Sequence, residues 1–177
     1  MHSERTSFLD WAFEVAGATA KRSTCARRAV GCALFNARRH ILATGYNGVA
    51  VGQPHCNHVA DEPIYGPEYK QTFSGKTSRY RDCIGFKKTR PHACPGVDMP
   101  SGQGLDLCHA IHAEQNALLQ CHDIHAIDVA VVTTAPCVTC TKLLLNTTCR
   151  AIYFKDPYAS SGEALWRAAG REWLERH

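Results

Sequence analysis

The hydrophobic residues in the first quarter of the chain predict one helix followed by a pair of strands. Residues 7–21 place apolar side chains at helical spacing on one face. Residues 30–35 form an apolar run rich in strand formers, and residues 40–46 form a second strand after the polar turn at 36–39. Two strands joined by such a short turn predict an antiparallel hairpin. The apolar helix face carries Phe8, Trp11, Val15 and Ala18.

The pattern changes between residues 49 and 107, where little periodicity is sustained over 59 residues. This stretch holds six of the eight prolines and seven of the thirteen glycines. Such a long loop is uncommon in a compact domain unless it is functional or is held together by something other than a hydrophobic core. It also contains three cysteines and three histidines, so a metal ion is a reasonable candidate for that role.

Regular structure is predicted again from residue 111 onward, where helical and strand patterns alternate. With the N-terminal helix and hairpin, this order predicts an α/β fold with a mixed five-stranded sheet between two helical layers. We expect residues 1–177 to form a single domain, with residues 49–107 as a long insertion after the second strand. The helices are expected at 111–120, 138–146 and 162–169, and the strands at 127–133, 151–154 and 172–174.

Composition and charge are those of an ordinary globular protein. Hydrophobic residues make up 45% and charged residues 20%, which excludes disorder of the whole chain. The formal net charge of +4 suits a small phosphorylated substrate and is weak evidence for nucleic-acid binding, which needs clustered basic residues. No apolar run approaches the length of a membrane span, and the first residues lack the apolar core of a signal peptide. We therefore expect a cytoplasmic protein with no membrane partner.

Cysteine and histidine are unusually frequent, with ten of each in 177 residues. In a secreted protein so many cysteines would indicate disulfides. Without a signal peptide, metal binding or catalysis is the better interpretation. Two short motifs stand out among these residues: His112-Ala113-Glu114 at the start of one predicted helix, and Pro136-Cys137-Val138-Thr139-Cys140 at the start of the next.

The spacing of these motifs suits a catalytic zinc ion. Cys137 and Cys140 lie three residues apart in the first turn of a helix, so both sulfurs face the same side, and the helix N-terminus favours the thiolate that binds zinc. His112 supplies a third ligand, which leaves the fourth position open for water. A redox pair or a structural zinc site is the alternative. A closed structural site has four protein ligands, so it would need a second pair of ligands at the spacing of a zinc finger. The 24 residues between His112 and Cys137 do not have the character of a zinc finger.

Glu114 is the candidate catalytic residue. In the middle of a helix it would point away from His112, but at a helix start the first residue need not be helical, so both side chains can reach one cavity. The pairing of the two motifs is the known signature of zinc-dependent deaminases. The expected role of Glu114 in such an enzyme is to take a proton from the water that zinc activates and to deliver protons to the ring nitrogen and the leaving ammonia.

The motifs resemble, more specifically, those of the deoxycytidylate (dCMP) deaminase family, including its phage and bacterial members. The segments at 108–117 and 134–140 look like its zinc motifs, and those at 24–31 and 45–48 are also typical of it. The resemblance covers nearly the whole chain, to about residue 160. It implies the three-layer α-β-α cytidine deaminase-like fold and a mononucleotide substrate.

The resemblance also implies contacts to the sugar and the phosphate. Asn47 would hydrogen-bond the sugar near its 3′-hydroxyl. Arg27 would hold the 5′-phosphate, with Thr24 and Arg28 as secondary candidates, because a guanidinium offers forked donors that suit phosphate. The alternative for the two arginines is an ordinary solvated loop.

Contacts to the base are implied at three positions. The backbone carbonyl of Ala135, which precedes Pro136, would contact the amino group of cytosine. Tyr153 or Tyr158 could stack on the base or lie beside it, and either is equally consistent with ordinary packing.

A second, structural zinc ion is expected in the insertion, whose sequence is too poor in periodic apolar residues to fold on its own core. Cys25 and Cys56 match positions that hold such a zinc in some phage members of the family, and Cys94 and Cys108 could complete a tetrahedral set. The alternative is that these are buried thiols that pack as small hydrophobic residues. Substitute ligands are His55, His92 and Cys83.

The expected function is zinc-dependent hydrolytic deamination of dCMP to dUMP, the precursor of dTMP, by a homo-oligomer of the kind that relatives form, commonly a hexamer. One alternative is a nucleic-acid deaminase that acts on tRNA adenosine or on cytidine in single-stranded DNA or RNA. That class needs a basic channel with aromatic residues, whereas the basic run at 87–90 has only Phe86 beside it. A third class, a non-catalytic assembly protein, is disfavoured by the intact Glu114.

Overall fold

The structure is a computed structural model that describes residues 5–53, 55–56, 60–65, 67–73, 76–80, 83–89, 96, 99–100, 103–104 and 107–176. The chain divides into two compact units. The first combines Met1–Cys56 with Cys94–His177, and the second is Asn57–Ala93. The second unit falls within the predicted insertion at 49–107. The prediction of a single domain with an insertion stays a prediction.

The first unit contains a five-stranded sheet made of β1 (Gly31–Phe35), β2 (Ile41–Tyr46), β9 (Val129–Thr134), β10 (Ala151–Asp156) and β11 (Glu172–Glu175). The strand order is β11-β10-β9-β1-β2. β1 pairs antiparallel with β2 and with β9, whereas β10 pairs parallel with β9 and with β11. The predicted hairpin and the predicted mixed sheet are therefore confirmed.

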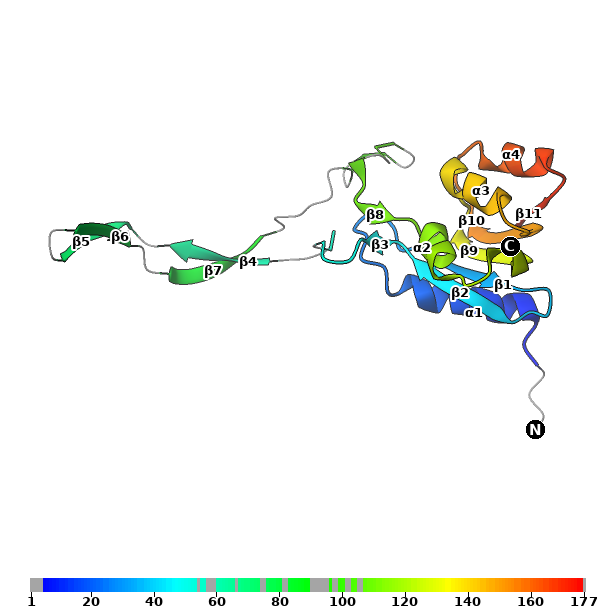
Figure 1. Ribbon diagram of the computed structural model, residues 1–177, viewed down its shortest axis with the longest axis horizontal. Helices are drawn as coiled ribbons and strands as arrows, with labels where there is room; N and C mark the ends of the chain where they lie inside the picture. The colour runs from blue at the N-terminus through cyan, green and yellow to red at the C-terminus, as the bar shows by residue number, and fades with distance from the viewer. Residues whose placement is uncertain are drawn as a thin grey trace. The chain divides into compact units, whose positions relative to one another are not determined.

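The helices of this unit are α1 (Phe8–Ala20), α2 (Ala113–Gln120), α3 (Val138–Leu145) and α4 (Gly162–Ala168), with a short 3₁₀ helix at Ile124–Ala126. α1 covers one face of the sheet, and the other three α-helices cover the opposite face (Figure 1). Alternating strand residues separate the two cores: Phe35 packs on the α1 side, and Leu34 packs on the other side. None of the helices in the described ranges combines the length and the apolar character that a membrane span needs.

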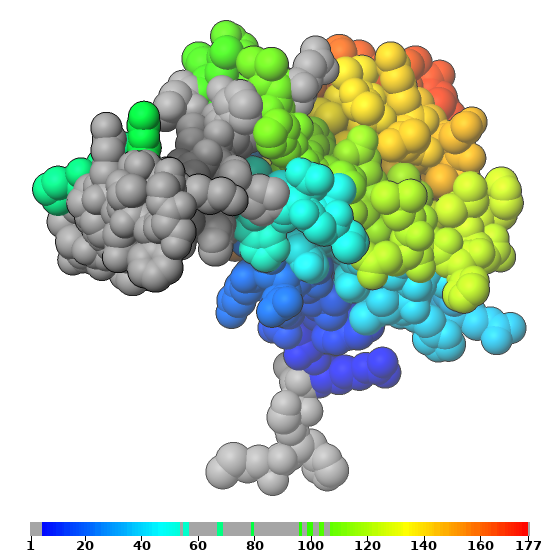
Figure 2. Space-filling view, turned by 60° about the vertical axis from the view of Figure 1, so that its left-hand side comes forward, coloured from blue at the N-terminus to red at the C-terminus, as the bar shows by residue number. Residues whose placement is uncertain are grey.

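Two glycines allow helices to pack unusually close to the sheet. A Cβ at Gly31 would lie 2.0 Å from the carbonyl oxygen of Ala16 in α1, and a Cβ at Gly45 would lie 2.2 Å from that of Ala113 in α2. Figure 2 shows part of the surface where the cyan β2 region lies between α1, in blue, and the yellow-green region of α2. Gly45 therefore sets how deeply the first turn of α2 rests on β2.

The two ends of the insertion come together in the first unit. β3 (Gly48–Val49) pairs antiparallel with β8 (Ala110–Ile111). Because Ala110 and Ile111 are used as a strand, the helix predicted from residue 111 begins only at Ala113. The backbone of the insertion thus returns directly to the start of α2.

The second unit consists of strands that the hydrophobic pattern did not predict. They are β4 (Ala60–Tyr65), β5 (Tyr69–Phe73), β6 (Lys76–Tyr80) and β7 (Cys83–Thr89). β4 pairs antiparallel with β7, and β5 pairs antiparallel with β6, so one hairpin is nested inside another. Their sequences mix polar and apolar residues without clean alternation, and this removes the period-two signal on which strand prediction depends.

Candidate metal centre and substrate pocket

The predicted zinc ligands meet at the N-termini of two helices. His112 is the N-cap residue of α2, Cys137 is the N-cap residue of α3, and Cys140 lies in the first turn of α3. The Nδ1 atom of His112 lies 3.5 Å from Sγ of Cys137 and 3.4 Å from Sγ of Cys140. Two ligand atoms of a tetrahedral zinc site, at the usual Zn–N and Zn–S bond lengths, are about 3.5 Å apart. The donor set and its spacing therefore fit zinc.

The electrostatics of the two thiols favour metal binding. The hydrogen bond from the Cys140 side chain lowers the pKa of Cys137 to about 4, so its thiolate forms readily. The same hydrogen bond raises the pKa of Cys140, since the pair shares a proton. A hydrogen bond with Cys137 is also the main cause of the raised pKa of His112. A cation bound among these three groups would replace the shared protons.

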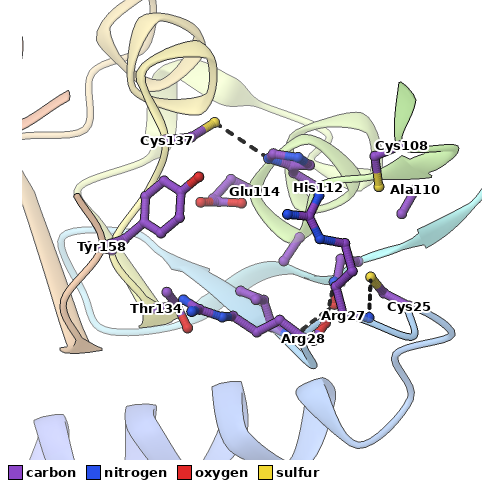
Figure 3. Close-up of a pocket in the computed structure, with 14 residues that line it drawn as sticks. Cys25, Arg27, Arg28, Cys108, Ala110, His112, Glu114, Thr134, Cys137 and Tyr158 are labelled. Atoms are coloured by element: carbon purple, nitrogen blue, oxygen red, sulfur yellow. Dashed lines mark hydrogen bonds between the residues drawn. The ribbon is translucent and has the colours of Figure 1, made fainter. Parts of the chain in front are cut away.

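Glu114 lines the same pocket as two of the metal ligands, His112 and Cys137. His112 has extended backbone torsions (φ −69°, ψ 158°), so it precedes the helical geometry that begins at Ala113. This is the arrangement that lets residues 112 and 114 point into one cavity, and Figure 3 shows both side chains there. Only 4% of Glu114 is exposed, and this burial raises the pKa of its carboxyl group. A carboxyl group with a raised pKa suits proton transfer near neutral pH.

Asn47 organises the loop at residues 23–30, which forms one wall of the pocket. Its Oδ1 accepts hydrogen bonds from the Ser23 hydroxyl at 2.7 Å and from the Val30 backbone N–H at 2.8 Å. Its Nδ2 donates to the Arg28 carbonyl at 2.6 Å, which uses one of the two amide protons. Asn47 lines the pocket, and its second amide proton has no hydrogen-bond partner among the described residues.

Arg27 and Arg28 both line the pocket, but they leave the loop in different directions (Figure 3). The Arg28 guanidinium lies over the ring of Tyr158, 5.8 Å from its centroid. The hydroxyl of Tyr158 points toward Glu114 in the same view. The Arg27 guanidinium donates instead to backbone carbonyls of the segment that follows the second unit.

The other predicted contact residues divide between the pocket and its surroundings. Ala135 is buried and lines the pocket. Thr24 does not line it, and its buried hydroxyl has no hydrogen-bond partner among the described residues. Tyr153 packs against the core on the α1 side of the sheet, because its side chain leaves β10 on that face. Of the two tyrosines, only Tyr158 lies at the pocket.

Sequence reasoning missed two contributors to this site. Thr134 lines the pocket immediately before Ala135, and in the sequence it stands out only as the first residue of the motif segment at 134–140. Ser23 holds Asn47 through its hydroxyl, and no pattern in the sequence marks that role. Adjacency to the Pro136–Cys140 motif was the signal that could have identified Thr134.

The ligands predicted for a second zinc are only partly within the described residues. Cys25 and Cys108 line the same pocket, and Cys56 is buried. Cys94 and the substitute His92 lie outside the described residues. Within the described ranges, the only group of three or more potential metal ligands is that of His112, Cys137 and Cys140, whose donor atoms lie within 4.8 Å of one another. The second site therefore stays a prediction.

Comparisons with known proteins agree with this site. The sequence model of the family described as the cytidine and deoxycytidylate deaminase zinc-binding region matches residues 6–156. The deoxycytidylate deaminase of Mycobacterium phage D29 is 31% identical over 141 residues, which cover 79% of this chain and 88% of that protein. The deoxycytidylate deaminase of Schizosaccharomyces pombe is 29% identical over 172 residues, 94% of this chain. The chain spans only 43% of the length of that yeast relative.

A solved structure supports the fold. The dCMP deaminase of cyanophage S-TIM5, determined in complex with dCMP and dUMP, superposes with a TM-score of 0.61 at 20% sequence identity. The superposition covers 98% of this chain and all of that chain. The cytidine deaminase-like α-β-α architecture is thereby confirmed.

Proposed function

The chain belongs to the family of the cytidine and deoxycytidylate deaminase zinc-binding region, and from this premise we propose that it catalyses the hydrolytic deamination of dCMP to dUMP. The observation that carries the proposal is the cluster of three metal ligands, two of which, His112 and Cys137, line the same pocket as the buried carboxyl group of Glu114. Relatives named deoxycytidylate deaminase and the phage structure with dCMP and dUMP support the choice of substrate.

Zinc held by His112, Cys137 and Cys140 would supply Lewis-acid activation of a water molecule at its open fourth position. Glu114 takes a proton from the attacking water and passes protons to the ring nitrogen and to the departing ammonia. A carboxyl group with a raised pKa can both accept and donate protons near neutral pH, which these successive transfers require.

The remaining pocket residues orient the nucleotide. The carbonyl of Ala135 accepts a hydrogen bond from the amino group of cytosine, and Tyr158 lies beside the base. Asn47 uses its second amide proton for the sugar hydroxyl. The loop at residues 23–30 carries the two guanidinium groups, Arg27 and Arg28, that give this end of the pocket the positive charge a 5′-phosphate needs.

Three further features belong to the proposal. A second, structural zinc is held by Cys25, Cys56, Cys94 and Cys108, and two of these residues already line one pocket. The protein works as a homo-oligomer, as the family resemblance implies. Light scattering that gives a monomer mass at micromolar concentration would contradict this. A cytoplasmic location follows from its use of free nucleotides.

Ammonia release from a panel of substrates tests the choice of substrate. The zinc-loaded protein is incubated separately with dCMP, CMP, deoxycytidine, dCTP and single-stranded DNA. We expect dCMP to give the highest kcat/KM, because the sugar and phosphate contacts are both used. A preference for single-stranded DNA would refute the proposal in favour of a nucleic-acid deaminase.

A further inference from the structure

Arg27 joins two parts of the chain that are far apart in sequence. Its Nη1 donates to the carbonyl of Gln103 at 3.2 Å, and its Nη2 donates to the carbonyls of Met99 at 3.1 Å and Pro100 at 2.9 Å. The guanidinium also packs against a buried glycine, since a Cβ at Gly96 would lie 3.4 Å from Nη1. One side chain thus gathers three carbonyls that lie 72 to 76 residues away along the chain.

These contacts use three of the five N–H donors of the Arg27 guanidinium, including both on Nη2, which is part of each fork that could bind a phosphate through two parallel hydrogen bonds. A bound phosphate at Arg27 would have to displace charge-assisted hydrogen bonds to carbonyl oxygens, which cannot turn into donors. Arg28 is in the opposite situation. Arg28 is exposed, and its guanidinium lies over the ring of Tyr158. Within the described part of the chain this guanidinium forms no hydrogen bond and no ion pair.

The segment that Arg27 holds leads directly into the metal centre. Gly96, Met99, Pro100, Gln103 and Gly104 are linked by backbone hydrogen bonds of successive turns, and Leu107 donates to Gly104. Cys108 then lines the pocket, and β8 follows immediately before His112. A displacement of this segment would therefore move one wall of the pocket and the strand that precedes the histidine ligand.

We propose that Arg27 is a positioning residue that fixes the returning end of the insertion against the wall of the pocket, and that Arg28 is the residue that discriminates substrates by their 5′-phosphate. The division of roles rests on the proposed deaminase function. The anchoring of the returning segment by Arg27 does not depend on that function, and it can be measured in the absence of turnover.

The kinetic test compares Arg27→Ala, Arg27→Lys and Arg28→Ala in the zinc-loaded protein, with dCMP and deoxycytidine as substrates. Arg27→Ala should lower kcat/KM for both substrates by similar factors, about ten-fold or more. Arg27→Lys should not restore activity, because an ammonium keeps the charge but lacks the fork that reaches three carbonyls. Arg28→Ala should raise KM for dCMP about ten-fold or more and leave deoxycytidine nearly unchanged.

The structural readout is amide hydrogen exchange of peptides that cover residues 96–107. Exchange should accelerate in Arg27→Ala and Arg27→Lys, and it should remain at the wild-type rate in Arg28→Ala and in the control Arg22→Ala, an exposed arginine between α1 and this loop. Wild-type exchange in Arg27→Ala, or a selective loss of dCMP turnover in that variant with rescue by lysine, would overturn the proposal.

The two proposals can fail separately. If the wild-type protein turns over neither dCMP nor deoxycytidine, the proposed function fails. Faster exchange at residues 96–107 in the Arg27 variants would then still support the anchoring role, and unchanged exchange would overturn it.

Discussion

At the scale of single residues, the site depends on what a helix N-terminus allows. His112 and Glu114 are two positions apart, which would place them on different sides of a regular helix. The extended torsions of His112 remove that conflict, so one side chain can bind metal while the other faces the same pocket. The buried Glu114 carboxyl group thereby lies beside the metal centre without being needed as a ligand.

Replacing Glu114 with glutamine separates proton transfer from metal binding. Glu114→Gln keeps the side-chain volume but cannot carry protons, so kcat should fall about 10²–10⁴-fold while the zinc content is unchanged. Kinetics on dCMP with parallel elemental analysis checks this. Glu163→Gln, on the exposed surface of α4, serves as the control and should behave as the wild type. A Glu114→Gln enzyme with the wild-type rate would eliminate this residue as the proton carrier.

A second prediction at the scale of residues concerns the side-chain amide of Asn47. In Asn47→Asp a carboxylate oxygen would face the Arg28 carbonyl that Nδ2 now contacts at 2.6 Å. The lost donor should lower the free energy of unfolding by about 1–3 kcal/mol. Asn36→Asp is a matched control, because among the described residues the Asn36 side chain bonds only through its Oδ1, which accepts from the backbone N–H groups of Arg38 and His40. Urea unfolding of both variants measures the difference, and equal stability would refute this role of Asn47.

The sequence predicted the residues that carry the chemistry but not all of those that hold them in place. The metal ligands and Glu114 could be identified because each motif is local and its spacing has a chemical meaning. The contact of Arg27 with Met99 and Gln103 joins segments more than 70 residues apart, and no local pattern records it. The family resemblance implies a phosphate contact for Arg27 instead, and that role stays a prediction.

At the scale of elements, the site is positioned by how closely α2 approaches β2. A Cβ at Gly45 would meet two backbone atoms, the Ala113 carbonyl oxygen at 2.2 Å and the Ala117 nitrogen at 2.3 Å. Neither atom can move without shifting the helix. The first turn of α2, with His112 and Glu114, would then leave its place opposite the cysteines of α3.

Gly45→Ala should therefore damage both stability and metal binding. We expect a loss of about 1–3 kcal/mol in the free energy of unfolding, as for other overpacked sites, and a lower zinc affinity. Gly17→Ala is the control, because a Cβ at Gly17 in α1 meets nothing within 4 Å and alanine favours the helix by about 1 kcal/mol. Thermal unfolding that shows Gly45→Ala as stable as Gly17→Ala would contradict this packing argument.

The helices and strands could be predicted where the hydrophobic residues follow one clear spacing, either that of a helix or that of a strand. The four α-helices and the five sheet strands of the first unit carry apolar faces or runs, and the structure confirms these nine predicted elements with small shifts at the ends, whereas the short strands β3 and β8 and the 3₁₀ helix were not predicted. The strands β4–β7 were not predicted, because their pairing depends on backbone hydrogen bonds between segments whose side chains do not alternate cleanly.

At the scale of the whole molecule, the insertion leads to a prediction of how many zinc ions each chain binds. The purified protein should carry two zinc ions per chain, because the insertion has little periodic apolar sequence from which to build its own core. Cys137→Ser should remove the catalytic zinc and leave the other in place. Elemental analysis that finds one zinc per chain, lost entirely in Cys137→Ser, would exclude the second site.

The most direct test of the central claim is the conversion of dCMP by the purified chain with and without its zinc. We expect the zinc-loaded protein to form dUMP and ammonia in equal amounts, the chelated protein to form neither, and added zinc to restore turnover. A zinc-loaded, folded protein that leaves dCMP unchanged, or a chelated protein that deaminates it at the same rate, would contradict the claim.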